Sequence, residues 1–332
     1  MYGSDRKKIL ILLILEILRR KSDADHHLTQ QKILRILKKT YGITCDRRSV
    51  KANVMDLVEM GYDINMDDDG YYFANLDFEP AELRMLIDSV LFSRHISLTQ
   101  GKRLIEKLKA QGNEYFQPKV SHVSALPDLS HADNNHIMLV IDTLNDAIAE
   151  KKRVEFTYNS YGTDFKLHPR QHSPYLVSPY QMVASNGRYY LLANSDRHPD
   201  LTHFRIDRIT DIRMTDIPIK PIKETIGMEK GFNLPRHMAE HTYMFCGESV
   251  RIQLKTTKSM MNDLIDWFGK YFIIIKEKDD DIIIEVTCNY NAMFYWALQY
   301  GSYVEVLSPK ELREELKNTI CKMHERYTLT RG

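Results

Sequence analysis

The sequence has 332 residues, 27% of them charged, and a formal net charge of +1 at pH 7. A chain of this length can form two or three domains, and 43% hydrophobic residues excludes a disordered or fibrous protein. Because the total charge is close to zero, a preference for nucleic acid has to come from local charge.

Cysteine content and hydropathy indicate the cellular compartment of the protein. The four cysteines are widely separated and form no CxxC pair; they are Cys45, Cys246, Cys288 and Cys321. This spacing favours reduced thiols over a disulfide framework or a zinc ribbon. The apolar run Ile9–Leu15 is interrupted by Glu16, is too short to span a membrane, and is followed by no small-residue cleavage site. We therefore expect a cytoplasmic protein without membrane contact.

The N-terminal region is locally basic and has helical periodicity. Residues 1–55 contain 13 Lys and Arg against five Asp and Glu, whereas residues 56–75 contain six acidic and no basic residues. Thr29 and Asp46 are suitable N-caps, and Gly42 is a suitable helix stop. The apolar spacing then predicts three helices: about Asp5 to Arg20, Gln30–Thr40 and Arg47–Met60.

Two short strand-like runs, Tyr62–Met66 and Tyr71–Phe73, follow, with Asp-Gly in the turn between them. Three helices and a hairpin predict a winged helix-turn-helix, whose third helix enters the major groove of DNA. Its predicted DNA-binding residues are Arg47, Arg48, Ser49, Lys51 and Asn53. Arg can read guanine, and Lys and Ser can hold phosphate. The alternative is a solvated helix face whose charges only keep the domain soluble.

The hairpin tip, Asp67–Gly70, carries three aspartates that would repel phosphate. We expect this wing to stay off the DNA backbone or to contact the protein. The acidic run lacks the length and the closing Glu of an EF-hand, so no calcium site is predicted.

A helical linker and a β-rich domain are predicted next. Helices begin near Pro80 and at Leu98, the polar segment Gln117–His136 has the composition of a linker, and another helix covers Ile137–Lys151. Short strand-like stretches then alternate with turns, which predicts a small, curled β-barrel. They are Val154–Tyr158, Val177–Val183, Tyr189–Leu192 and Phe204–Ile212.

The order VEFTY, VSPYQMV, GRYYLL and FRIDRI resembles the WYL domain of bacterial transcription regulators. The Trp-Tyr-Leu triplet that names this family stands here as Tyr189-Tyr190-Leu191. The N-terminal winged helix matches the usual partner of the domain. The stretch Glu248–Tyr327 is similar to the extension that commonly follows it. The resemblance implies an Sm-like barrel with a basic, aromatic surface for a nucleotide or a single-stranded nucleic acid.

The resemblance also implies a set of ligand-binding residues. They are Tyr175, Tyr190, His203, Arg205, Asp207 and Arg208. Arginines pair with phosphate, aromatic rings stack on bases, and Asp207 can orient an arginine or merely neutralise it. Many relatives have Arg where this chain has Tyr175, and a basic residue where it has His203, so the site should be less basic than usual. Strand alternation predicts that Tyr189 packs inward and Tyr190 outward.

The C-terminal region reads as strand, helix, strand, strand, helix and strand, which predicts a small α+β module. No GxSxG, Walker, HExxH or GxGxxG motif occurs, and the 13 histidines show no obvious pairing. We therefore predict no enzyme, no metal site and no cofactor.

Taken together, the sequence predicts an α+β multidomain protein. Its predicted parts are a winged helix-turn-helix (1–75), a helical linker (76–136), a WYL domain with an Sm-like barrel (137–220) and an α+β extension (221–332). The predicted function is a homodimeric transcriptional regulator that binds an operator in double-stranded DNA and senses an anionic ligand. The alternative is an accessory nucleic-acid-binding protein that modulates a phage-defence or CRISPR effector.

Overall fold

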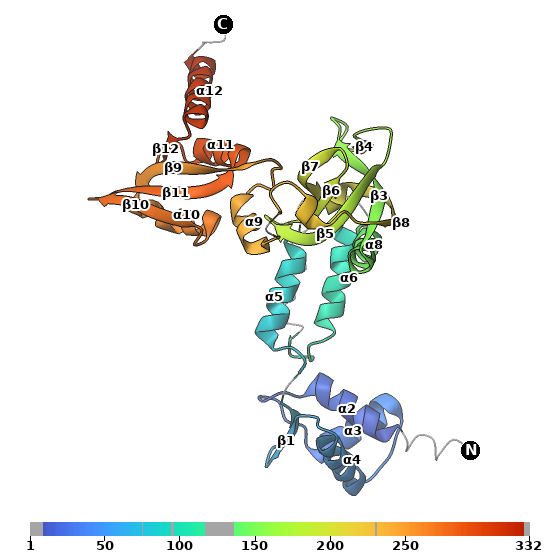
Figure 1. The fold of residues 1–332 in the computed structure, drawn as a ribbon. Helices are drawn as coiled ribbons and strands as arrows, with labels where there is room; N and C mark the ends of the chain where they lie inside the picture. The colour runs from blue at the N-terminus through green and yellow to red at the C-terminus, as the bar shows by residue number, and fades with distance from the viewer. Residues whose placement is uncertain (1–8, 75, 94–95, 117–135, 230, 329–332) are drawn as a thin grey trace. The chain divides into compact units, whose positions relative to one another are not determined.

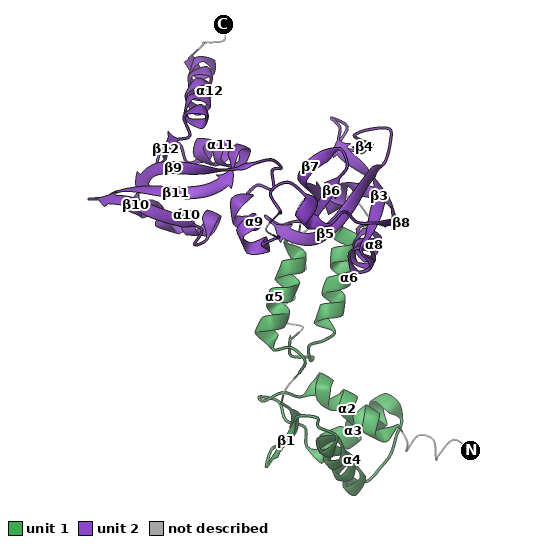
Figure 2. Cartoon of the chain, viewed as in Figure 1, with its two compact units in different colours: residues 1–133 green, residues 134–332 purple. Residues whose placement is uncertain are grey.

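A computed structural model describes residues 9–74, 76–93, 96–116, 136–229 and 231–328 (Figure 1). The chain forms two compact units, Met1–Asp133 and Asn134–Gly332 (Figure 2). Among the described residues, no helix has both the length and the apolar character that a membrane crossing requires.

The described part of the first unit contains three helices where three were predicted, and the predicted start of the first, residues 5–8, lies outside the described residues. The three helices are α2 (Leu10–Lys21), α3 (Gln30–Tyr41) and α4 (Arg47–Glu59). The Thr29 hydroxyl accepts the backbone N–H of Lys32 at 3.2 Å, and Gly42 ends α3 in the left-handed conformation with φ 66°. These contacts satisfy backbone groups that a helix end leaves open, which confirms the predicted caps.

The hairpin of strands β1 (Ile64–Asp67) and β2 (Gly70–Phe73) follows α4. Tyr71 exchanges two backbone hydrogen bonds with Leu28, at 2.8 and 3.0 Å, so the hairpin is held against the segment that precedes α3. Apolar side chains from all three helices and the hairpin share one buried core around Ile14, Ile33 and Val54. The predicted order of helices and hairpin is thus present.

Further along the described part of the first unit is a pair of helices, α5 (Pro80–Leu91) and α6 (Leu98–Lys109), joined by a small core around Leu83, Ile87 and Ile105. Ion pairs between Arg19 and Asp77 and between Lys21 and Glu114 connect α2 to the segments that flank this pair. The two predicted helices of the linker are thus present, whereas its polar segment Gln117–His136 falls outside the described residues, apart from His136.

The second unit begins with α8 (Ile137–Glu150), which packs on a curled, six-stranded antiparallel sheet. Its strands pair in the order β4-β3-β5-β6-β7, and β8 pairs with β3. The bounds are β3 (Lys152–Tyr161), β4 (Leu167–Pro169), β5 (Tyr175–Ser185), β6 (Arg188–Ser195), β7 (His198–Arg205) and β8 (Ile209–Pro218). Phe156, Leu191 and Phe204 lie in the core between the sheet and α8.

The prediction of one continuous strand over Phe204–Ile212 was wrong. Strand β7 ends at Arg205, a 3-10 turn η2 (Ile206–Arg208) follows, and β8 begins at Ile209. The Asn159 side chain donates to the backbone carbonyl of Arg208 at 3.0 Å and so stabilises the turn. Polar and apolar residues alternate from Phe204 to Asp207, past the end of β7, which is why the start of the turn looked like strand.

The C-terminal module has the predicted order of strands and helices. Its elements are β9 (Ser249–Thr257), α10 (Met261–Phe268), β10 (Phe272–Lys278), β11 (Asp281–Asn289), α11 (Tyr290–Gln299), β12 (Glu305–Ser308) and α12 (Lys310–Thr328). The strands pair antiparallel in the order β10-β11-β9-β12, over a core that contains Phe268 and Trp296. Strand β10 is an edge, and Ile273, Ile274 and Ile275 on it are exposed.

A short helix, α9 (Leu234–Glu240), lies between the curled sheet and the C-terminal module and was not predicted from the sequence. Its side chains Leu234 and Met238 join a separate apolar cluster with Leu192 of β6 and Leu201 of β7. Helix α9 therefore packs against the face of the sheet that lies opposite α8.

Candidate functional site

The N-terminal half of α4 is a basic, accessible surface. Arg47, Arg48 and Lys51 are exposed, whereas Ser49 and Asn53 are half-buried. Asp46 accepts the backbone N–H of Ser49 at 2.7 Å, and the Asn53 side chain donates to the Ser49 carbonyl at 2.7 Å. The predicted DNA-binding residues thus form two groups: three charges that face solvent, and two polar side chains close to the helix backbone.

A groove of about 560 Å³ lies between α4, the start of α3 and the hairpin tip. Arg47 and Lys51 line one part of it, and Asp67 and Asp68 line another. Asp67 contacts the protein through His27, whose Nδ1 lies 3.0 Å from Asp67 Oδ1. The same carboxylate oxygen also accepts the backbone N–H groups of Asp69 and Gly70 in the turn. This wing aspartate is therefore engaged within the domain.

A second basic group gathers on the sheet of the second unit, where β6 pairs with β7. Tyr190 lies opposite Arg205 in this pair, so their side chains leave the same face of the sheet. Tyr189 points to the opposite face and packs on the core under α8. The predicted inward position of Tyr189 and outward position of Tyr190 are therefore present.

Arg205 is held in one orientation by a two-pronged ion pair. Its Nε donates to Asp207 Oδ1 at 3.0 Å and its Nη2 to Oδ2 at 2.5 Å. The Asp207 side chain is 2% exposed and that of Arg205 15%. Two parallel charged hydrogen bonds fix the plane of the guanidinium, which leaves its outer edge as a preformed donor surface.

Two phenols and three further arginines surround this pair. The backbone N–H of Arg205 donates to the Tyr158 hydroxyl at 3.1 Å, and the Arg170 guanidinium lies 5.7 Å from the centre of the Tyr158 ring. Arg208 has a buried Nε for which the described residues offer no hydrogen-bond acceptor. We call Tyr158, Arg170, Arg188, Tyr190, Arg205, Asp207 and Arg208 the arginine cluster.

The charges in the arginine cluster favour an anion. Burial raises the pKa of Tyr158 and Tyr190, while the charges of neighbouring arginines oppose that rise, so both phenols stay neutral at pH 7. Four guanidinium groups stand against one carboxylate, that of Asp207. A neutral phenol beside fixed guanidinium groups can donate to phosphate oxygens and pack against a base.

Two of the predicted ligand residues lie mainly outside the arginine cluster, although the Tyr175 ring meets the Tyr158 ring edge-on with 5.9 Å between their centres. Tyr175 packs on the aromatic core, parallel to Phe156 with 6.0 Å between the ring centres and edge-on to Phe204. His203 is 8% exposed and contacts His237 and His241, two side chains contributed by α9 and its end. The sequence pattern could place His203 on the outer face of β7 but could not show that α9 covers it.

The three histidines form a buried cluster that the sequence analysis missed. His203 Nε2 and His237 Nε2 are 2.8 Å apart, and the rings of His237 and His241 stack with 4.0 Å between their centres. Burial lowers the pKa of His203 to about 4 and that of His237 to about 2. All are therefore neutral at pH 7. In the sequence, the four-residue spacing of His237 and His241 was the signal that could have indicated this cluster.

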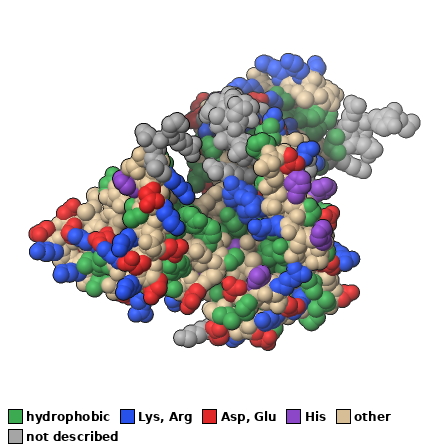
Figure 3. All heavy atoms as spheres, turned by 90° about the horizontal axis from the view of Figure 1, so that it is seen from above, with side chains coloured by type: hydrophobic (Ala, Val, Ile, Leu, Met, Phe, Trp, Pro, Cys, Tyr) green, Lys and Arg blue, Asp and Glu red, His purple; other side chains and the backbone are tan. Residues whose placement is uncertain are grey.

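Arg170 and Arg188 were also missed in the sequence. Arg188 stands two residues before Tyr190, so strand alternation could have placed both on one face. Arg170 follows β4, in a stretch with no periodicity, and only the fold brings it to Tyr158. Elsewhere on the surface shown in Figure 3, acidic and basic side chains are interspersed, in keeping with a net charge of +1.

Comparison with known proteins identifies two domains in the second unit. The WYL domain model matches residues 140–214, and the WCX domain model matches residues 248–323. The arginine cluster lies in the first of these ranges, and α9 with two of the clustered histidines lies between them.

Two solved structures are similar to the chain. One is proteasome accessory factor B/C (PafBC) of Arthrobacter aurescens, with 16% identity over 96% of this chain and 49% of that chain, and a TM-score of 0.30. The other is a CRISPR Cas-related protein, with 13% identity over 75% of this chain and 73% of that chain, and a TM-score of 0.41. The chain spans about half the length of the first. A comparison with curated proteins gave no match. The chain thus contains a WYL domain followed by a WCX domain.

Proposed function

We propose that this chain is a cytoplasmic, DNA-binding transcriptional regulator whose WYL domain senses an anionic ligand. The observation that carries the proposal is the arginine cluster, where a guanidinium fixed by Asp207 stands beside a neutral Tyr190 phenol. Fixed donors next to an aromatic ring suit a nucleotide or a short single-stranded nucleic acid, because phosphate and base are recognised together. No catalytic role is proposed for these residues.

The DNA-binding part of the proposal rests on α4. Three helices followed by a hairpin have the order of a winged helix-turn-helix, in which the start of the third helix reaches the base edges. Arg47, Arg48 and Lys51 are exposed there, and among the described residues none of them forms an ion pair. The acidic wing tip fits a docking mode in which α4 contacts the major groove and the wing stays away from phosphate.

A homodimer completes the proposed mechanism. Two copies would place two α4 helices on the half-sites of a palindromic operator. The exposed isoleucines on edge strand β10, Ile273 to Ile275, support pairing with a second copy, because an apolar open edge is a surface that associates. A ligand that binds one dimer arrangement more tightly than another would shift their populations and change the affinity for DNA.

The DNA part is tested by gel shift on the DNA upstream of the protein's own gene. Arg48→Ala and Lys51→Ala should weaken binding, by about 1–3 kcal/mol if the lost contact reads a base. A lost phosphate contact should instead reduce the slope of log K against the logarithm of the salt concentration by about one. Arg103→Ala, an exposed arginine on α6, is the matched control for the loss of a positive charge. Unchanged binding in both α4 variants would reject α4 as the recognition helix.

The ligand part is tested by titrating nucleotides and short single strands against variants of the arginine cluster. Arg208→Ala should weaken binding by about tenfold or more, because a charged hydrogen bond contributes about 1.5–3 kcal/mol. Arg213→Ala is the control, since that arginine is 73% exposed on β8 of the same domain. Equal losses in both variants would point to non-specific charge. Binding of single strands without any operator shift would favour the accessory-protein alternative.

A further inference from the structure

The buried histidine cluster of the second unit brings three imidazole rings from two elements together. His203 comes from β7, and His237 and His241 come from one turn of α9 and its end. Their side chains are 8%, 5% and 7% exposed, and one ligand atom from each lies within 4.8 Å of the others. Two histidines four residues apart on a helix, with a third from another element, form a common set of metal ligands.

Backbone contacts orient two of these rings. The Nδ1 of His203 lies 3.0 Å from the Met244 carbonyl, and the Nδ1 of His241 lies 3.0 Å from the His237 carbonyl. Only a protonated Nδ1 can donate to a carbonyl, so the lone pair of each of these rings is on Nε2. The His203 Nε2 then accepts the Nε2–H of His237 at 2.8 Å, a proton that would move to the His237 Nδ1 when His237 Nε2 binds a metal. An imidazole that donates one N–H to a carbonyl and turns its other nitrogen inward has the second contact typical of a metal ligand.

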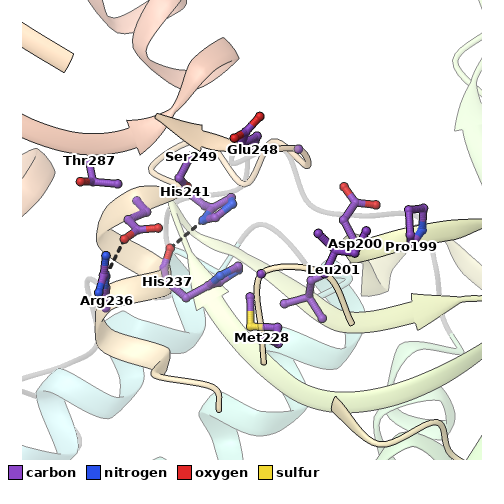
Figure 4. A pocket seen from close by; sticks show the side chains of 14 residues that line it. Pro199, Asp200, Leu201, Met228, Arg236, His237, His241, Glu248, Ser249 and Thr287 are labelled. Carbon is purple, nitrogen blue, oxygen red and sulfur yellow. Dashed lines mark hydrogen bonds and ion pairs between the residues drawn. The ribbon is translucent and has the colours of Figure 1, made fainter. Parts of the chain in front are cut away.

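The cluster also adjoins an open space with negative charge nearby. His237 and His241 line a cavity of about 830 Å³, together with the acidic residues Asp200, Glu240 and Glu248 (Figure 4). Glu240 makes an ion pair with Arg236 at 2.7 Å, so its carboxylate is already engaged and is not counted as a metal ligand. The cavity gives an ion a path to the rings and leaves room for a water molecule beside them.

From this geometry we propose that His203, His237 and His241 bind one divalent transition-metal ion, with Zn²⁺ as the preferred ion. Neutral imidazole nitrogens suit Zn²⁺, and three of them leave a fourth tetrahedral position, here toward the cavity. Ligands of one tetrahedral ion at about 2.0 Å stand about 3.3 Å apart. His203 Nε2 and His237 Nε2, now at 2.8 Å, would therefore separate by roughly half an ångström on binding.

Such an ion would fasten β7 to α9. Helix α9 is only seven residues long, and the chain runs from its end into β9 of the WCX domain. The metal would therefore fix the segment that joins the WYL sheet to the WCX domain. This inference does not depend on the proposed binding of DNA or of an anionic ligand.

The test uses the full-length chain, freed of metal with a chelator and then titrated with Zn²⁺ or Co²⁺ alone. The wild type should bind one ion per chain by mass spectrometry of the metal content, and the Co²⁺ form should show the intense visible absorption of a tetrahedral site. His203→Gln and His237→Gln should each weaken binding by tenfold or more. His198→Gln, at an exposed position on the same strand, is the matched control and should bind like the wild type.

Two results would overturn the proposal. One is a wild-type chain that takes up less than one ion or shows only the weak Co²⁺ spectrum of an octahedral site. The other is equal affinity in the control and in both cluster variants. If a cluster variant fails to fold, the wild-type stoichiometry and the Co²⁺ spectrum still decide, because neither measurement uses a variant.

Discussion

Replacing Arg205 by alanine should destabilise the WYL domain in addition to weakening anion binding. The change leaves the Asp207 carboxylate, 2% exposed, without the guanidinium that now contacts both of its oxygens. Removing one partner of a buried ion pair costs about 3–5 kcal/mol. Because the Arg205 side chain is itself 15% exposed, we take the lower value, about 3 kcal/mol.

This cost can be measured as a change in melting temperature. For a unit of 150–250 residues, 1 kcal/mol shifts Tm by about 2–4 °C, so Arg205→Ala should lower it by roughly 6–12 °C. Circular dichroism of the full-length chain would follow the transition. The double variant Arg205→Met with Asp207→Leu should melt close to the wild type, because replacing a whole buried pair by apolar groups is often neutral.

An ion pair on the surface of the same domain provides the control for Arg205→Ala. Arg213 and Glu155 form an ion pair at 2.7 Å, but Arg213 is 73% exposed, so Arg213→Ala should cost less than about 1 kcal/mol. If Arg205→Ala melted as close to the wild type as this control does, the ion pair would not stabilise the turn after β7. Loss of anion binding in that variant could then be assigned to the missing guanidinium alone.

Three further predictions concern single positions. Asp46→Ala should lower the stability of α4 at pH 7; because the capped backbone N–H lowers the Asp46 pKa below its usual 3.8, the difference from the wild type should shrink as the pH falls below that value. Gly70→Ala should cost more than about 1 kcal/mol in urea denaturation, since its Cβ would lie 2.6 Å from the Leu28 carbonyl oxygen at φ +135°, whereas Gly42→Ala, with open space, should cost less. Trp296→Phe should cost less than Trp296→Ala, for which about 3–5 kcal/mol is typical, because among the described residues the Trp296 Nε1 has no hydrogen-bond acceptor to lose. An equal loss of melting temperature in these two variants would contradict this.

Local patterns predicted the N-terminal helices well because their signals are local. Thr29 and Asp46 cap the helices that directly follow them, and Gly42 ends one of them. The inward position of Tyr189 and outward position of Tyr190 followed from strand alternation in the same way. In each case the physical cause lies within a few residues of its effect.

The missed features depend on contacts between distant segments. Residues 34 positions apart, His203 and His237, meet only because α9 folds back onto β7, and α9 is too short for a clear periodic pattern. The break after Arg205 was hidden because the alternation of polar and apolar residues runs on to Asp207, inside the turn. Arg170 reaches Tyr158 from the loop after β4, which no pattern in the sequence indicates.

The 3-10 turn at the end of β7 makes residue count across this segment matter more than residue identity. Arg205 precedes this turn and Arg208 ends it, and the charges of both act on Tyr158 and Tyr190, so the turn brings both arginines near the same two phenols. One inserted or deleted residue between them would turn Arg208 away while leaving Arg205 in register with Tyr190. Alignments of related chains should therefore tolerate exchanges within this turn but few gaps, and a relative with a gap here should lack the proposed anion binding.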